Sequence, residues 1–216
     1  MRERYHRALE ALDQDVVRLG ALAEAAIDKA TLALVENDAE LAQQVLDGDD
    51  EIDALFVDVT KRALTILAEQ APVARDLRLL LSIIRVANEL ERTGDLAHNI
   101  AKVPQRGIPV GEVKHIGELL HELAVAARKL LGNAIDVWAQ KDAGLAANVQ
   151  EYDDTIDLLY RRFYKELFAL GSDETTFEIG MNAALVGRWF ERVADHGVNI
   201  TEAVQFYVTG DDAYLG

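Results

Sequence analysis

The stretch ELERTGDLAHNI, residues 89–100, and the stretch WFERVADHGVNI, residues 189–200, carry the same polar residues at the same spacing. Each copy contains Glu-Arg-x-x-Asp-x-x-x-Asn-Ile within an apolar pattern of period 3.6, which predicts a helix. Because residues four apart share one face of a helix, each copy would place a glutamate, an aspartate and an asparagine in one row. The candidate rows are Glu91, Asp95 and Asn99 in the first copy, and Glu191, Asp195 and Asn199 in the second.

The rest of the chain repeats as well, which indicates an internal duplication. At an offset of 104 residues, the acidic stretch GDDEIDAL (48–55) matches YDDTIDLL (152–159), and after the next turn the offset becomes 100. The match adds a second pair of carboxylates to each half. These pairs are Asp49 with Asp53, and Asp153 with Asp157. The first half has four more residues between its two acidic motifs, and a length change confined to a hairpin tip would leave both motifs in place.

The apolar periodicity predicts six long helices and no strand, so the fold class is all-α. Three prolines, at 72, 104 and 109, fall where the periodicity pauses. The expected helices span about residues 2–36, 40–69, 75–103, 112–140, 142–170 and 175–208. Residues 105–111, rich in Pro and Gly, are expected to link a first domain, 1–104, to a second, 112–216. Large aromatic side chains at helical spacing are expected in the core, namely Trp138, Trp189, Phe163, Phe168 and Phe190.

The relative level of the acidic motifs follows from the hairpin that the second and third helices of each half would form. In an antiparallel hairpin, residues equally far from the turn lie side by side. Counted from a turn at 69–74, Asp49 comes level with about Thr93, and Asp53 with about Glu89. The pair Asp49 and Asp53 would therefore lie beside Glu91 and Asp95, and the second half repeats the arrangement. Four carboxylates are thus expected to converge in each half.

Converging carboxylates need a positive partner, because like charges repel and a buried carboxylate must be neutralised. Oxygen ligands from Asp, Glu and Asn suit iron, manganese, magnesium or calcium better than a tetrahedral zinc site. An internal ion-pair network with Arg92 and Arg192 is the alternative, and the spacing favours neither. His98 and His196 have no counterpart in the other half, so they are expected to be neighbours of these groups rather than ligands.

Composition excludes several functions. The 38 acidic and 22 basic residues give a formal net charge of -16, which repels nucleic acid and anionic lipid. The chain has no cysteine, which excludes disulfides and thiolate chemistry. A charged first segment and an apolar run broken by Arg85 favour a cytoplasmic protein that would reach the inner face of a membrane only through a partner. We find no nucleophile-base-acid set, phosphate loop or dinucleotide fingerprint, so none of these motifs indicates an enzyme.

One pattern supports an enzyme-class alternative. Glu112 with His115, and Glu118 with His121, match the Glu-x-x-His spacing of ferritin-like di-iron bundles. Both pairs lie on one expected helix, whereas such a site needs two. A di-metal carboxylate oxidase or metal store is therefore kept as the alternative, and a metal-free helical scaffold is the third hypothesis.

The chain resembles the PhoU family of phosphate-uptake regulators over essentially its whole length. The resemblance lies in APVARDLRLLLSIIRVANELERTGDLAHNIA (71–101) and FERVADHGVNITEAV (190–204). It implies two similar three-helix bundles related by a pseudo-twofold axis, with multinuclear iron or zinc clusters on Glu/Asp-xxx-Asp motifs. The corresponding positions here are Asp49, Asp53, Glu91, Asp95, Asn99, Asp153, Asp157, Glu191, Asp195 and Asn199. Where the family allows Glu or Asp at the first motif position, this chain has Asp in both copies.

The resemblance also implies a role that connects phosphate transport to gene expression. Such a protein would associate with the ATPase subunit of the phosphate-specific ABC transporter and with a membrane sensor histidine kinase. It would repress the phosphate-starvation response when phosphate is sufficient. Two helical repeats with exposed faces make a homodimer the expected assembly.

Overall fold

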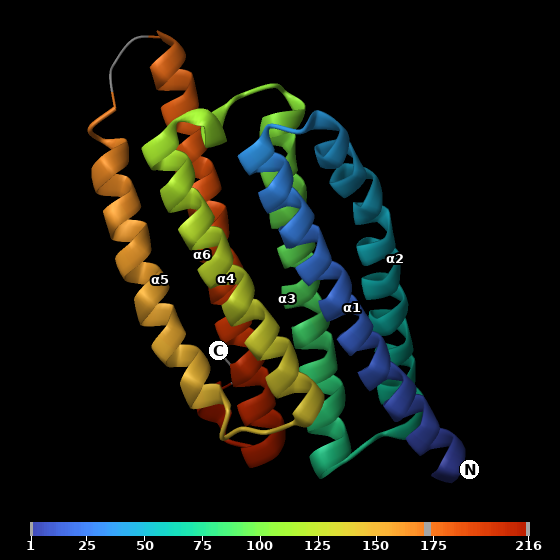
Figure 1. Cartoon of the computed structure of the whole chain (residues 1–216). Helices are drawn as coiled ribbons and strands as arrows, with labels where there is room; N and C mark the ends of the chain where they lie inside the picture. Colours follow the sequence, from blue (N-terminus) through green and yellow to red (C-terminus); the bar gives the residue numbers. More distant parts are fainter. Residues whose placement is uncertain (1, 171–173, 215–216) are drawn as a thin grey trace.

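The computed structural model describes residues 2–170 and 174–214, and within these residues the chain is helical and contains no strand. The six long helices are α1 (Arg2–Glu36), α2 (Ala39–Gln70), α3 (Ala74–Gln105), α4 (Lys114–Gln140), α5 (Ala146–Leu167) and α6 (Glu174–Thr209) (Figure 1). Two short 3-10 helices, η1 (Val110–Glu112) and η2 (Asp212–Tyr214), follow α3 and α6. The prediction of an all-α fold with six long helices is confirmed.

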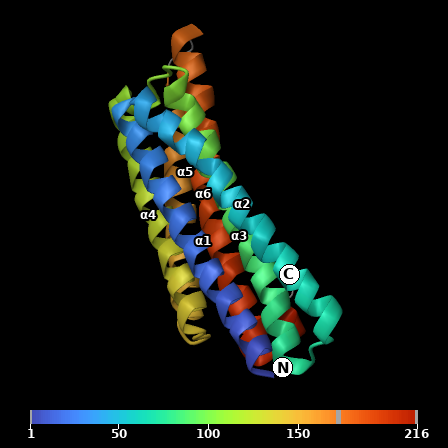
Figure 2. The same cartoon turned by 90° about the vertical axis from the view of Figure 1, so that its right-hand side faces the viewer.

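The helices form two three-helix bundles, α1–α3 and α4–α6, that pack against each other along their lengths. Helix α3 packs on α6, and α1 packs on α4. The partners in each pair run in opposite directions (Figure 1). Figure 1 shows α1 and α4 in front of α3 and α6, and in Figure 2 the two layers lie side by side, with α4 and α1 to the left of α6 and α3. An approximate twofold axis perpendicular to the helices therefore relates the two halves. The α2/α3 and α5/α6 hairpins consequently turn at opposite ends of the molecule.

Apolar stripes on the helices form one continuous core that runs through both bundles. The largest fully buried side chains include Leu12, Leu19, Ile27, Trp138 and Phe163. Full burial of a side chain of this size stabilises the fold by about 1.5–3 kcal/mol. Among the described helices, none has the length and apolarity needed to cross a bilayer.

The two halves begin their second helices differently. Asp38 is the N-cap of α2, where its Oδ1 accepts hydrogen bonds from the Glu40 and Leu41 amides at 2.9 Å. Its counterpart Asp142 instead accepts a hydrogen bond from the Gly144 amide at 2.8 Å, within a turn. Helix α5 therefore begins at Ala146 and not at 142 as predicted.

Helix α5 also ends earlier than predicted, at Leu167. Phe168 follows in a turn and is 85% exposed, so its predicted place in the core was wrong. Of the other aromatic residues expected there, Trp138, Phe163 and Phe190 are buried, and Trp189 is partly buried against the core.

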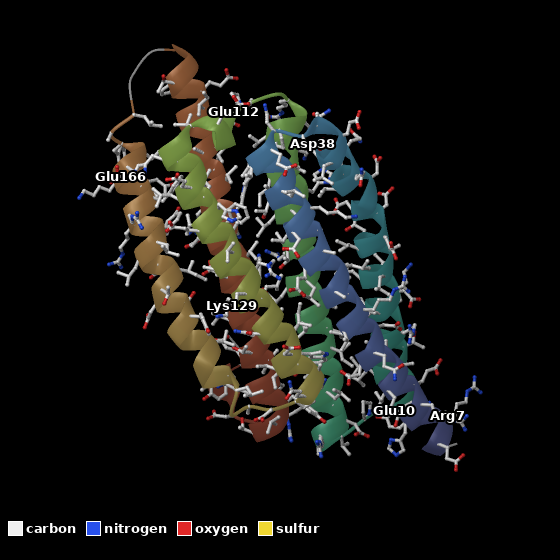
Figure 3. The ribbon with its side chains drawn as sticks, in the orientation of Figure 1. Arg7, Glu10, Asp38, Glu112, Lys129 and Glu166 are labelled. Carbon is white, nitrogen blue, oxygen red and sulfur yellow. The ribbon has the colours of Figure 1, made fainter. Side chains whose placement is uncertain are left out.

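The segment between the two bundles is packed against them. Helix α3 continues through Pro104 to Gln105, beyond the predicted end at 103. Val110 is fully buried. A Cβ atom added to Gly111 would lie 2.6 Å from the carbonyl oxygen of Leu34 at the end of α1. At the same end, the Asn37 amide donates a hydrogen bond to Glu112 at 3.3 Å, and Figure 3 shows Asp38 and Glu112 together there.

Candidate functional site

Helices α2 and α3 lie close together at Gly94. A Cβ atom added to Gly94 would lie 3.0 Å from Ile52 Cδ1 and 3.6 Å from Asp49 Oδ1. The missing side chain thus lets α2 approach and directs Asp49 toward α3. One turn further along α3, His98 Nδ1 lies 2.8 Å from Asp49 Oδ2.

These contacts place Asp49 between Gly94 and His98, so the sequence-based count, which put Asp49 level with about Thr93, differs from the structure by about one helical turn or less. Helix α2 runs to Gln70 and α3 begins at Ala74, each within one residue of the predicted bound. The contacts place the acidic pair of α2 beside the acidic pair of α3.

We name Asp49, Asp53, Glu91 and Asp95 the first carboxylate cluster. Burial raises the pKa of Asp49; the charges of Asp53 and Asp95 raise it further, while His98 lowers it. Burial also raises the pKa of Glu91, and Asp95 and Asp53 add to this effect. Each carboxylate therefore acts electrostatically on its neighbours, as expected for side chains that share one face of the hairpin.

We name Asp153, Asp157, Glu191 and Asp195 the second carboxylate cluster. Burial raises the pKa of Asp153, and Asp195 and Asp157 raise it further. Burial and Asp195 likewise raise the pKa of Glu191, while an ion pair with Arg188 lowers it. The other carboxylate oxygen of Glu191, Oε2, is buried without a hydrogen-bond partner among the described residues.

The two predicted arginines do not pair with the clusters. Arg92 and Arg192 are exposed, and neither forms an ion pair within 4.0 Å in the described part of the chain. Arg92 only lowers the pKa of Glu91 through longer-range attraction. His98 and Arg188 take the close positions instead. His98 was expected as a neighbour of the acidic groups, whereas Arg188 was not, and its spacing of three residues from Glu191 is the sequence signal that could have identified it.

The two asparagines at the ends of the rows have other partners. The Asn199 amide donates a hydrogen bond to Glu89 Oε2 at 3.0 Å, and His196 Nδ1 lies 2.6 Å from the same oxygen. Because Asn199 follows Glu191 by eight residues, its side chain is rotated from that of Glu191 by about 80° around the axis of α6, toward α3. Asn99 accepts a hydrogen bond from Lys102 at 3.4 Å.

The contact of Glu89 with His196 and Asn199 lies in the interface between the halves. Burial alone would raise the pKa of Glu89, but the hydrogen bonds from His196 and Asn199 outweigh burial and leave it lowered. His196 is therefore a neighbour of the acidic row, as expected, and its partner is a carboxylate on the opposite bundle.

The donor chemistry of both carboxylate clusters fits a hard metal cation, because up to eight carboxylate oxygens lie on each hairpin face. As the side chains stand, no three His, Asp or Glu side chains in the described part of the chain are placed to hold one metal ion. Asp53, Asp95, Asp157 and Asp195 are exposed, so packing does not fix their rotamers. Binding of a cation would therefore require these carboxylates to turn inward.

The residues of the ferritin-like alternative are separated from one another. Glu112 pairs with Asn37, and His115 lies 3.3 Å from Glu166 on α5. His121 lines a groove between α1 and α4. The described residues thus give this alternative no gathered ligand set.

Comparison with known proteins agrees with the fold and with the duplication. The PhoU domain model matches residues 16–103 and 120–204, one match in each bundle. A phosphate-specific transport system accessory protein PhoU homolog of Pseudomonas putida is 34% identical over 97% of this chain and 82% of its own.

Two crystal structures have the same architecture. PhoU from Pseudomonas aeruginosa matches with a TM-score of 0.90 and 32% identity, over 96% of this chain and 100% of its own. The phosphate transport system regulatory protein PhoU from Streptococcus pneumoniae matches with a TM-score of 0.85 and 27% identity, over 96% and 98%. The chain that carries these two carboxylate-bearing bundles therefore belongs to the PhoU family.

Proposed function

We propose that this protein is an accessory protein of phosphate transport that represses the phosphate-starvation response when phosphate is sufficient. It would connect the ATPase subunit of the phosphate transporter to a membrane sensor histidine kinase. It would carry out no reaction itself, and it would reach the inner face of the membrane through these partners.

The observation that carries this proposal is the match of the whole two-bundle chain to relatives named for phosphate transport. The relative from Pseudomonas putida is named as an accessory protein of that system, and the one from Streptococcus pneumoniae as its regulatory protein. Both matches cover more than nine tenths of this chain, so they extend across both bundles. Long exposed helical faces and a net charge of -16 suit contacts with basic surfaces of larger partners.

Complementation tests the proposal. A strain that lacks the gene for this chain, and that carries a reporter on a phosphate-starvation promoter, should express the reporter at high phosphate. Restoring the chain should return the reporter to its repressed level. Purified ATPase subunit and cytoplasmic kinase domain should each retain the protein, and less of it as salt rises. A reporter that stays repressed in the deletion strain would contradict the proposed role.

We further propose that the carboxylate clusters hold divalent or trivalent cations, with iron and zinc the first candidates. The support is the donor set and the raised pKa of Asp49, Glu91, Asp153 and Glu191, which burial and the neighbouring carboxylates cause. A bound cation would neutralise the repulsion in each cluster and hold the second and third helices of a half together.

Element analysis of protein purified without chelator tests the cation. The wild type should carry metal, and Asp95→Ala combined with Asp195→Ala should lose it. The matched control is Asp50→Ala combined with Asp154→Ala, which removes the same charge from exposed positions one residue beyond Asp49 and Asp153. Equal metal content in the wild type and the first variant would place the metal elsewhere.

A further inference from the structure

Between each carboxylate cluster and the nearby hairpin turn, large apolar side chains are exposed. In the first half these are Val57 and Leu64 on α2 with Leu77 and Leu81 on α3. In the second half they are Phe168 after α5 with Phe177 and Met181 on α6. We name these sets the first and second apolar strips. Every member is more than a third exposed, and single exposed apolar residues are ordinary, whereas grouped ones mark interaction surfaces.

Each apolar strip lies on the same helical face as the carboxylate cluster of its half. Leu77 and Glu91 are fourteen residues apart on α3, which is close to four full turns, so they point to the same side. The same spacing separates Phe177 from Glu191 on α6. On α2, Asp53 and Leu64 are eleven residues apart, or about three turns. Each hairpin thus presents one surface, apolar near the turn and acidic about 21 Å further along.

The two strips correspond under the internal repeat at every member except Val57, whose counterpart is Arg161. Leu64 and Phe168 are related by the offset of 104, and the offset of 100 relates Leu77 to Phe177 and Leu81 to Met181. These positions are exposed, so core packing does not require apolar residues there. The strips lie at opposite ends of the molecule, since Glu166, just before Phe168, is at the upper end of α5 in Figure 3, whereas the α2/α3 turn is at the lower end.

We propose that each apolar strip, together with its carboxylate cluster, is a docking site for an amphipathic helix of a partner protein. That helix would present apolar side chains at one end and Lys or Arg at the other, and about 14–18 residues would span the surface. Charge complementarity at the acidic end fixes the direction in which the helix docks. This inference rests on the proposed function, which supplies protein partners, and it gives each chain two equivalent sites.

A second copy of this chain fits the strips poorly. If two hairpin faces paired in parallel, carboxylate cluster would meet carboxylate cluster, and like charges in contact disfavour association. If they paired antiparallel, each apolar strip would cover a carboxylate cluster and bury unpaired charge. A partner with a basic end avoids both costs.

Isothermal titration of the full-length protein, with chelator present, tests the docking site. The probe is a synthetic 18-residue helix with leucines on one face of its first half and lysines in its last two turns. Two peptides should bind per chain. The variant Leu77→Ser, Leu81→Ser should bind one, as should Phe177→Ser, Met181→Ser, and the fourfold variant should bind at least tenfold more weakly. A peptide with glutamates in place of the lysines should also bind at least tenfold more weakly.

The matched control is Leu32→Ser combined with Val125→Ser, which changes exposed apolar residues on the α1/α4 layer. This variant should keep two sites with unchanged affinity, and all variants should unfold at similar temperatures. The proposal fails if the wild type binds no peptide, if the strip variants keep both sites, or if charge reversal has no effect. It also fails if sedimentation shows a dimer that only the strip variants dissociate. The reporter assay tests the proposed function separately. If the peptide binds but the chain does not repress the reporter, the proposed function is contradicted and the docking site is not.

Discussion

Neutralising Asp195 should stabilise the metal-free protein at neutral pH. The Asp195 carboxylate raises the pKa of both Asp153 and Glu191, so it opposes the ionisation of two neighbours. Like-charge contacts on partly exposed helices cost about 0.2–0.5 kcal/mol each, so removing two gains about 0.4–1 kcal/mol. For a chain of 216 residues, 1 kcal/mol corresponds to about 2–4 °C. The variant Asp195→Asn should therefore raise Tm by about 1–4 °C.

The gain from Asp195→Asn should depend on pH with a defined sign. A carboxyl group whose pKa is raised by folding contributes stability at low pH and loses it as pH rises through the raised pKa. Asp153 and Glu191 are such groups, so their repulsion with Asp195 is present at neutral pH. As pH falls through their raised pKa values, protonation relieves the repulsion, and the difference in Tm should vanish.

Scanning calorimetry in chelator at low ionic strength measures this effect, and high salt should reduce it. The control is Asp50→Asn, because Asp50 is exposed and is not among the charges that shift Asp49 or Glu91. A binding cation should reverse the order, because it stabilises the wild type by mass action more than the variant. A Tm for Asp195→Asn at or below the wild type in chelator would refute the repulsive cluster.

Three further substitutions test the packing. Glu89→Gln should cost about 1–3 kcal/mol in urea unfolding, because Glu89 accepts charge-assisted hydrogen bonds across the two halves. Since folding lowers the pKa of Glu89 below 4.5, its contribution is lost as pH falls, and the variant should lose less stability in acid than the wild type. Gly187→Ala should cost about 1–3 kcal/mol, because its Cβ would lie 2.5 Å from Phe163 Cε1. Gly180→Ala, with its nearest atom at 3.9 Å, should instead gain up to about 1 kcal/mol, and equal effects at both glycines would contradict the packing.

The helices and the two carboxylate clusters could be predicted because their signals are local and repeated. Apolar periodicity predicts each helix, and the duplication of Asp49/Asp53 and Glu91/Asp95 predicts which helical faces carry the carboxylate clusters. The exact level of α2 against α3 could not be predicted in the same way. It depends on where α2 ends and on the close approach at Gly94, and a change of two residues at a helix end shifts every pairing along the hairpin.

The first residue of a helix also could not be predicted where equivalent residues of the two halves behave differently. Asp38 and Asp142 occupy equivalent positions, yet only Asp38 caps a helix. The residue two places later is Glu40 in the first half and Gly144 in the second. Glycine favours a turn over a helix, so α5 begins four residues after Asp142, whereas α2 begins directly after Asp38.

The interface between the two halves shows that the internal duplication does not predict every contact. Glu89 meets His196 across α3 and α6, whereas the equivalent positions hold Trp189 and Leu96. One of these two symmetry-related pairs of residues is thus polar and the other apolar. The carboxylate clusters, and every member of the first apolar strip except Val57, have counterparts of the same kind in the other half, on the outer faces of the hairpins. Duplication on the surface is therefore the better sign of a binding role, and the single Glu89–His196 contact is better explained as part of the fold.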